Sequence, residues 1–293
     1  MNASHRFAKR PKVTTGLALL ALHVGACAAA IPALFSWSGV AVGFIGYYLT
    51  GGIGICLGYH RLLTHRGMRF PRVLEYAFAT CGVLALQGGP IFWVATHRAH
   101  HAFPDTERDP HDSRRGFLWS HMAWLYRSNP ARLSHAQELR YAADVAADPY
   151  YRFLEWSPLL WQIALGAALF AFGGWSWVVW GIFVRLVVTY HATWLVNSAS
   201  HLFGYRTYTT PAADRSTNNW LVALVAWGEG WHNNHHAFPF SARHGLAPFE
   251  FDPTWWAVAA LRRLGLAREV KVPDAAMLRR RTPPAPPARV RAT

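Results

Sequence analysis

Charged residues and cysteines are scarce in this sequence. Asp, Glu, Lys and Arg together make up 15% of the 293 residues, whereas a soluble domain has about 25%. The three cysteines, Cys27, Cys56 and Cys81, lie apart in apolar stretches and form no metal or redox motif. The composition argues against an ordinary soluble protein. It also excludes a disulfide framework and a four-cysteine iron–sulfur site, and there is no His-Pro-Gly-Gly haem segment.

Apolar residues, by contrast, make up 52% of the chain and gather in long runs. The runs at residues 13–37 and 40–57 are each close to the ~20 residues that cross a bilayer. The runs at residues 159–172 and 175–196 form a second pair. Uncharged turns at residues 36–39 and at Gly173-Gly174 join the members of each pair. The pattern predicts an all-α integral membrane protein with four transmembrane helices in two hairpins.

The charges that are present are unevenly placed. Lys and Arg outnumber Asp and Glu by 29 to 15, and most of the cations lie at the N-terminus, in residues 98–152 and towards the C-terminus. Because cytoplasmic segments of membrane proteins are enriched in Lys and Arg, we expect both termini and the active site in the cytoplasm, in a bacterial inner membrane. The basic surface is expected to meet anionic membrane lipid or an acidic electron donor, and no nucleic acid.

A fifth apolar stretch, residues 73–93, is interrupted by Glu75, Gln87 and a Gly-Gly-Pro sequence. We interpret it as a re-entrant or interfacial helix, which keeps the histidines before and after it on one side of the membrane. The sequence thus predicts one domain, residues 1–272, whose cytoplasmic helical cap holds a di-metal site. Residues 273–293 are rich in Pro, Ala and Arg, and we expect them to be a disordered tail.

Sixteen histidines are the unusual feature of the composition. Eight lie in three clusters, and the HxxHH pattern occurs twice, although chance would supply roughly 0.05 copies. Residues three or four apart share one face of a helix, so each HxxHH set can bind one centre. His201 follows Asn197 by four residues and is a further candidate, with Asn197 acting directly or through water. The clustered residues are His60, His65, His97, His100, His101, His232, His235 and His236.

Nine imidazoles are too many for one metal, so the clusters predict two metals with four or five ligands each. Imidazole alone leaves zinc or iron open. The nearby carboxylates, Asp105, Glu107, Asp109 and Glu229, lie outside the clusters. We assign His111, His121 and His191 structural or supporting roles. The remaining histidines, His5, His23, His135 and His244, are treated as background.

At this point the sequence resembles a known family, the membrane fatty-acyl desaturases of the delta-9 type. The resemblance covers residues 40–273 and is closest to the cyanobacterial, plant and actinobacterial branch. The motifs that carry it are Gly58-Tyr59-His60-Arg61-Leu62-Leu63-Thr64-His65, Thr96-His97-Arg98-Ala99-His100-His101, Asp109-Pro110-His111, Gly116-Phe117-Leu118-Trp119-Ser120-His121, Asn197-Ser198-Ala199-Ser200-His201, Gly228-Glu229-Gly230-Trp231-His232-Asn233-Asn234-His235-His236 and Ser241-Ala242-Arg243-His244-Gly245.

The resemblance implies a di-iron centre that uses O2 and places a cis double bond, at delta-9, in a saturated acyl chain. By analogy, one iron takes His60, His65, His97, His101 and His236. The other takes His100, His201, His232 and His235, with a water held by Asn197. The electrons then come from a separate donor, which is a ferredoxin, a b-type cytochrome or a flavoprotein reductase.

The acyl chain is expected in a narrow tunnel lined by aromatic residues of the spans. Candidates for its wall are Tyr47, Trp93, Trp119, Trp194 and Trp227, and Arg114, Arg115 and Arg127 are candidates for phosphate contacts. The animal acyl-CoA enzymes have an Arg-Asp pair where this chain has Ala95 and Thr96. Both acyl-CoA and acyl-lipid therefore stay open as substrates, and so does acyl carrier protein.

Three other functions compete with this one. A histidine-box hydroxylase of alkanes, sterols or carotenoids would use similar clusters. A zinc-dependent membrane hydrolase would need neither O2 nor a reductant. A haem-binding electron-transfer subunit is disfavoured by the HxxHH spacing, because haem ligands usually come from facing helices.

Overall fold

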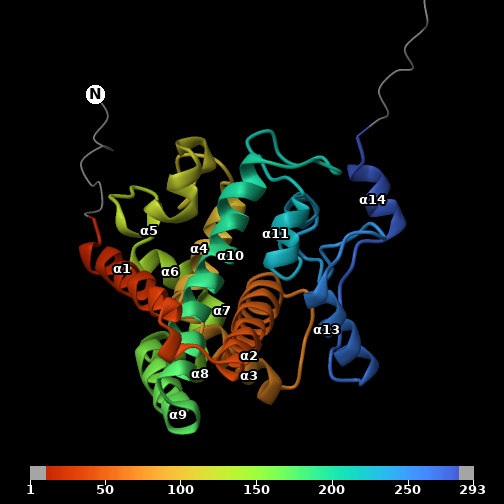
Figure 1. Cartoon of the computed structure of the whole chain (residues 1–293). Helices are drawn as coiled ribbons and strands as arrows, with labels where there is room; N and C mark the ends of the chain where they lie inside the picture. Colours follow the sequence, from red (N-terminus) through yellow and green to blue (C-terminus); the bar gives the residue numbers. More distant parts are fainter. Residues whose placement is uncertain (1–10, 284–293) are drawn as a thin grey trace, which may run out of the picture.

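The computed structural model describes residues 11–283, and these are helical apart from turns, loops and three isolated β-bridges. The all-α class is therefore confirmed. The elements, shown in Figure 1, are α1 (Val13–Cys27), η2 (Ala28–Ala30), η3 (Pro32–Leu34), α2 (Trp37–Tyr47), η4 (Tyr48–Thr64), α3 (Arg72–Val83), α4 (Pro90–Ala102), η5 (Ser113–Arg115), η6 (Trp119–Ala123), α5 (Trp124–Tyr126), α6 (His135–Tyr141), α7 (Ala143–Ala146), α8 (Pro149–Trp156), α9 (Pro158–Val178), η7 (Val179–Val184), α10 (Arg185–Leu202), α11 (Trp220–Val225), α12 (His232–Ala237), α13 (Pro253–Arg263) and α14 (Ala275–Arg281).

Three helical segments are long and apolar enough to cross a membrane: Val13–Ala30, Trp37–Thr64 and Pro158–Leu202. The third segment reverses at Gly174, whose φ of 60° and ψ of −157° are not helical. Glycine adopts this backbone without a steric penalty. The reversal brings Gln162 of α9 within 3.1 Å of the Arg185 guanidinium, 23 residues away in sequence. The hairpin turn predicted at Gly173-Gly174 is therefore present.

The first two long segments pack against the middle of this hairpin. Glycines allow the close approach: Gly25 of α1 faces the Phe183 ring, and Gly43 of α2 lies against the backbone of Trp180. The two hairpin turns also touch, because the hydroxyls of Ser36 and Ser176 are 2.7 Å apart. The spans therefore assemble around η7.

The stretch predicted as re-entrant consists of two short helices, α3 and α4, joined by a tip at residues 84–89. Polar side chains satisfy the carbonyls of this tip. Leu84 accepts hydrogen bonds from Gln162 (2.6 Å) and Arg185 (2.8 Å), and Leu86 accepts one from Tyr190 (2.9 Å). The rings of His65, before the stretch, and His97, within α4, have centroids 5.2 Å apart. The residues before and after the tip of this stretch therefore lie next to each other.

A chain of histidines joins α1 to the interior. His23 is 3.0 Å from His191 of α10, which is 2.9 Å from His121, which is 3.0 Å from the hydroxyl of Ser198. His191 thus makes the helix–helix hydrogen bond expected of it, and His121 is structural as well. His23, treated as background, is in fact the link through which α1 joins this chain.

The C-terminal segment differs from expectation. Residues 275–281, predicted to be part of a disordered tail, form α14, which Asp274 caps through a 2.8 Å bond to the backbone N–H of Met277. Leu278 packs on the cluster of Tyr208 and Phe238, and the buried apolar contact holds the helix in place. Residues 284–293 of the predicted tail lie outside the described part of the chain.

Candidate metal centre

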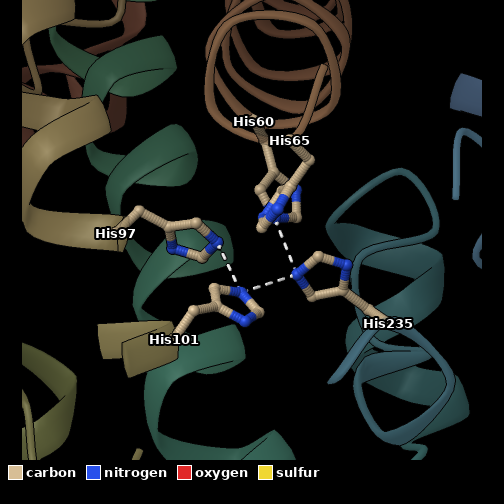
Figure 2. A group of neighbouring side chains, drawn as sticks. All are labelled: His60, His65, His97, His101 and His235. Atoms are coloured by element: carbon tan, nitrogen blue, oxygen red, sulfur yellow. Dashed lines mark hydrogen bonds between the residues drawn. The ribbon is translucent and has the colours of Figure 1, made fainter. Parts of the chain in front are cut away.

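Five histidines from three separate elements converge in a first group. The group consists of His60, His65, His97, His101 and His235, and their candidate ligand nitrogens lie within 4.8 Å of one another. Figure 2 shows His60 and His65 coming from η4 and its end, His97 and His101 from α4, and His235 from α12, with the rings pointing toward one centre. The i, i+4 spacing of His97 and His101 places both on one face of α4.

Four more histidines form a second group beside the first. His100 of α4, His201 of α10, and His232 and His236 of α12 also have their nitrogens within 4.8 Å of one another, and all four are buried. The rings of His101 and His236, one from each group, stack with centroids 4.5 Å apart. All nine predicted histidines therefore meet in two adjacent groups.

The nitrogen spacing in both groups fits a metal polyhedron. The Nε2–Nε2 distances are 2.9, 3.1 and 3.1 Å in the first group and 3.0, 3.1 and 3.3 Å in the second. Metal–nitrogen bonds of about 2.0–2.1 Å place ligands at right angles about 2.9 Å apart and tetrahedral ligands about 3.3 Å apart. Two of the six distances are at or near the right-angle value, three lie midway and one equals the tetrahedral value, so the spacing alone does not select a geometry. Five imidazoles, however, exceed the four ligands of a structural zinc site.

Hydrogen bonding alone does not account for the first group. Nδ1 of His60 lies 2.7 Å from the Glu229 carboxylate, and a proton on this nitrogen would leave a lone pair on Nε2. Nε2 of His235 contacts the Nε2 atoms of both His60 and His101, yet a neutral imidazole has one N–H to donate. Nε2 of His65 is buried and has no hydrogen-bond partner. A cation at the centre would satisfy all of these lone pairs.

Burial favours the neutral imidazole at several histidines of both groups, whereas at His100 the Asp109 carboxylate outweighs burial and raises the pKa. Burial lowers the pKa values of His97, His101, His232 and His235 well below the usual range, and neighbouring imidazoles lower them further. The pKa of His236 falls to about 4 because burial outweighs the nearby Asp214. Neutral imidazole is the form that binds metals, and its affinity for protons is already weak at the histidines with a lowered pKa.

Carboxylates that the sequence did not assign to the site orient the second group. Nδ1 of His100 lies 2.8 Å from Asp109, Nδ1 of His201 lies 2.8 Å from Asp105, and Nδ1 of His236 lies 3.0 Å from Asp214. Each bond fixes the tautomer and directs Nε2 to the centre. Burial opposes charge on these carboxyls, but their histidine and backbone N–H partners hold all three pKa values well below the usual range.

A second buried network supports the first group. Glu229 lies 2.7 Å from His60 and 3.0 Å from His244, and its other oxygen accepts from Arg61. Arg61, fully buried, also forms a paired contact with Asp252 at 2.9 and 3.0 Å. His244, treated as background in the sequence, therefore belongs to the centre. The ring of His111 stacks on that of His100, 4.3 Å between centroids, which fits its expected supporting role.

The structure groups two histidines differently from the partition predicted by analogy. His235 belongs with the five-histidine group, where His236 was expected, and His236 belongs with the four-histidine group. The two residues are adjacent on α12, so their rings point to different centres. Asn197 is one helical turn before His201 and lines a cavity beside His60, His97 and His232.

Two cavities meet next to the histidines. A large one of about 490 Å³ runs along α1, α4 and α10, and a small one of about 40 Å³ lies between α2, η4, α10 and the loop before α12. They share Trp93, His97, Thr193 and Asn197. At the join, Gln87 donates to Thr193 (2.9 Å) and accepts from the Trp93 indole (3.3 Å). Two adjacent, mostly apolar cavities thus lie beside the histidine groups.

The predicted tunnel residues divide into two sets. Trp93 and Trp194 line the large cavity, and Tyr47 and Trp227 line the small one. Trp119 lines neither of these two cavities and lies instead under the Arg115 guanidinium, 3.1 Å from the ring centroid. Arg127 and Arg114 also line neither cavity. Arg114 pairs with Asp112 at 3.0 Å, which leaves it poorly suited to the phosphate contact expected of it.

Comparison with known proteins agrees with this site. Residues 33–268 match the family model for fatty acid desaturases. The chain belongs to the fatty acid desaturase family. It is 57% identical over 258 residues to the sn-1 stearoyl-lipid 9-desaturase of Anabaena variabilis, covering 88% of this chain and 93% of that one. It is 49% identical over 268 residues to the enzyme of the same name from Synechocystis sp., covering 90% and 83%.

A plant relative shows that the substrate carrier varies among desaturases of this similarity. The acyl-CoA 5-desaturase of Anemone leveillei is 47% identical over 253 residues, covering 86% of this chain and 77% of that one. The desaturase family is membrane-bound, as the three long apolar helical segments suggest. The protein is accordingly an oxidoreductase that desaturates fatty acyl chains.

Proposed function

We propose that this desaturase holds two irons, one in each histidine group, and uses O2 to place a cis double bond at delta-9 of a saturated chain carried by a membrane lipid. The observation that carries the proposal is the pair of adjacent imidazole groups beside the join of two apolar cavities. When bound, the irons supply the oxygen-activating chemistry. The ligands would be the nine histidines, with Asn197 holding a water.

The residues around the centre perform the binding and positioning. The acyl chain lies bent through the two cavities, with its carboxyl end in the large cavity and its methyl end in the small one. Gln87, Trp93 and Thr193 fix the bend, so that two adjacent methylenes lie beside His97 and Asn197. Buried apolar walls exclude water, which would otherwise compete for a strong oxidant. The depth of the small cavity, limited by Tyr47 and Trp227, then sets the double-bond position.

Two facts support a membrane lipid as the molecule that carries the acyl chain. The cyanobacterial relatives of highest identity named above act on stearoyl-lipid, and the positions of the Arg-Asp pair in the animal acyl-CoA enzymes are Ala95 and Thr96 here. We therefore favour an acyl-lipid over acyl-CoA. A short pulse of labelled stearate in an expressing host tests this, because a lipid-linked reaction places the first labelled oleate in intact glycerolipid. First appearance in the acyl-CoA pool would support CoA as the carrier.

The topology that fits this chemistry has four crossings. The first two crossings are the long segments Val13–Ala30 and Trp37–Thr64. The other two are the halves of Pro158–Leu202 on either side of Gly174. Both termini and the histidines then lie in the cytoplasm, and the uncharged turns lie outside. Cysteine labelling from each side, at residue 38 and at residue 274, tests this arrangement. Labelling of both positions from the same side would contradict it.

The activity itself is tested by the fatty-acid profile of a host that expresses the wild-type chain. His100→Ala should abolish the new unsaturated acid, whereas His135→Ala, an exposed histidine far from both groups, should leave it unchanged. About two irons per chain should accompany activity. Hydroxylated products without an olefin would favour the hydroxylase. Zinc with an activity that needs neither O2 nor reductant would favour the hydrolase.

A further inference from the structure

Electrons for desaturation must enter from outside the chain. Removal of two hydrogens from an acyl chain by one O2, with two protons and two electrons taken up, gives the olefin and two waters. The three cysteines lie apart, and the sequence contains no four-cysteine iron–sulfur motif and no His-Pro-Gly-Gly haem segment, so we expect the electrons to come from a separate donor. A donor protein must therefore approach the histidine groups closely, and its docking surface should lie where few residues separate them from solvent.

One such place lies over the third histidine box, which consists of His232, His235 and His236. Loop 203–217 and α14 pack there, and Leu278 of α14 contacts the cluster of Tyr208 and Phe238 that follows the box. Asn233, inside the box, accepts hydrogen bonds from the backbone N–H groups of Thr207 and Tyr208 at 2.7 and 2.8 Å. The loop in turn contacts α14, whose Arg281 carbonyl accepts from the N–H of Thr209 at 2.7 Å.

The surface of these two segments is strongly and unusually cationic. It bears five exposed arginines, which we call the arginine patch: Arg206, Arg215, Arg279, Arg280 and Arg281. The carboxylate within the two segments, Asp214, is buried against His236. Arg206 and Arg281 donate to carbonyl oxygens instead of carboxylates. The described residues therefore give the patch no ion-pair partner.

Three other arginines near the site have carboxylate partners. Arg66 and Arg98 pair with Asp144 at 2.5 and 2.6 Å, and Arg69 pairs with Glu269 at 3.1 Å. A cluster of arginines without ion-pair partners produces a positive electrostatic potential, which extends about 8 Å into the solvent at physiological ionic strength. Such a field steers a partner of opposite charge and orients it on arrival.

We propose that the arginine patch is the docking site for an acidic one-electron carrier protein, which reduces the centre through the third histidine box. This rests on the proposed function. An anionic membrane surface is the competing occupant. It is disfavoured because α14, Ala-Ala-Met-Leu-Arg-Arg-Arg, exposes none of the aromatic residues that anchor interfacial helices. Figure 1 also places α14 at the top of the molecule, far from α9 and the hairpin turns.

The test uses the full-length enzyme in nanodiscs and, as the probe, an acidic plant-type [2Fe–2S] ferredoxin kept reduced by its reductase. R279Q/R280Q removes two patch charges whose side chains make no described hydrogen bond. R262Q/R263Q is the matched control, because it removes two exposed arginines from the last turn of α13. The patch variant should raise KM for ferredoxin about tenfold with kcat unchanged and should flatten the salt dependence.

Binding supplies a readout independent of turnover. The affinity for oxidised ferredoxin, measured by surface plasmon resonance, should fall with R279Q/R280Q and not with R262Q/R263Q. Single-turnover desaturation after dithionite reduction should be equal in all three proteins. Equal KM and affinity in the two variants would overturn the proposal. So would a loss seen only in nanodiscs with anionic lipid, which would assign the patch to the membrane. Failure of desaturation with every reductant would instead contradict the proposed function.

Discussion

The guanidinium of Arg185 donates a 2.8 Å hydrogen bond to the carbonyl of Leu84, at the tip of the re-entrant hairpin. Arg185 is 1% exposed, and its partners are all neutral oxygens, including Gln162 and the carbonyl of Gly181. Within an apolar bundle, a carbonyl at a helix end has no water to satisfy it. The arginine therefore serves as the cap of α3.

Replacement of Arg185 by Met should destabilise the protein. Each acceptor left without a donor costs about 1–3 kcal/mol, and the Gln162 amide oxygen loses its partner. Thermal unfolding in detergent measures the effect, with Arg185→Lys as a partial rescue. Because the tip leads into Gln87, the Met variant should also spread the product over several double-bond positions. A variant with wild-type stability and a single product would contradict this role.

Loss of an orienting carboxylate should weaken metal binding without removing a ligand. Asp109→Asn keeps the size of the side chain but no longer fixes the tautomer of His100, and such changes typically cost 10–100-fold in affinity. Iron content after dialysis against a chelator measures the loss. Asp274→Asn, at the cap of α14, is the control and should retain full iron. Equal retention in both variants would mean that the carboxylate does not support a metal.

The two histidine groups should lose metal separately. His65→Ala removes a ligand from the five-histidine group and should leave about one iron per chain, held by the other group. His201→Ala should do the reverse. Metal analysis, together with a spectrum sensitive to iron–iron coupling, separates the two cases. Loss of both irons from each variant would show that the groups cannot fill independently.

Enlargement of the small cavity should move the double bond. Trp227 lines its end, together with Tyr47, so Trp227→Ala lets the methyl end slide deeper. The bond should then form nearer the carboxyl end, and longer chains should be accepted. Gas chromatography of product derivatives gives the position. Trp256→Ala, which removes an exposed tryptophan of α13, is the control and should leave the products unchanged.

The stability of the fold should fall between pH 6.5 and 4 in part because of His121. Burial, and next the neighbouring His191, lower the pKa of His121 to about 4, whereas an unfolded histidine titrates near pH 6.5. Across this interval the unfolded chain binds a proton that the folded chain does not. The contribution is complete above pH 6.5 and is lost as the pH falls toward 4.

His121→Gln removes this titration while keeping an amide that can bond to Ser198. Melting temperatures of variant and wild type, measured in half-unit steps from pH 7 to pH 4, should converge as the pH falls. Parallel curves would assign the acid sensitivity to other groups.

Much of this architecture was accessible from sequence because its determinants are local. Apolar runs and an uncharged Gly173-Gly174 turn predict the second hairpin, and HxxHH spacing predicts which histidines share a helix face. The split of His235 and His236 between two centres was not accessible, because it depends on how α12 is rotated against α4 and η4. The analogy with the family assigned His236 to the group of His60 and His235 to the group of His100.

The supporting residues were missed for a different reason. Asp105 and Asp109 follow the second box within eight residues, and the need of each metal-bound histidine for an Nδ1 partner was a usable signal. Asp214 gave none, because the loop that brings it in is fixed only by tertiary contacts, and His244 gave only its place in a motif shared with the family. The helix at 275–281 was hidden by the Pro- and Arg-rich composition around it, and the contacts that hold it, the packing of Leu278 and the bond between Thr209 and Arg281, are tertiary.

The placement of α1 indicates when this helix packs against the others during synthesis of the chain. Only 6% of the apolar window Val13–Ala30 is buried, which leaves most of its surface for lipid if the segment crosses a membrane. Apolar surface by itself gives two helices no hydrophobic reason to associate in a bilayer, so we expect the contact of His23 with His191 and the close packing of Gly25 on Phe183 to bring α1 to the bundle. The first span to leave the ribosome would therefore be among the last to dock, after residue 191 has been made. Until then the large cavity lacks the wall supplied by Lys12, Thr15 and Leu19, and the nascent enzyme stays open to the membrane.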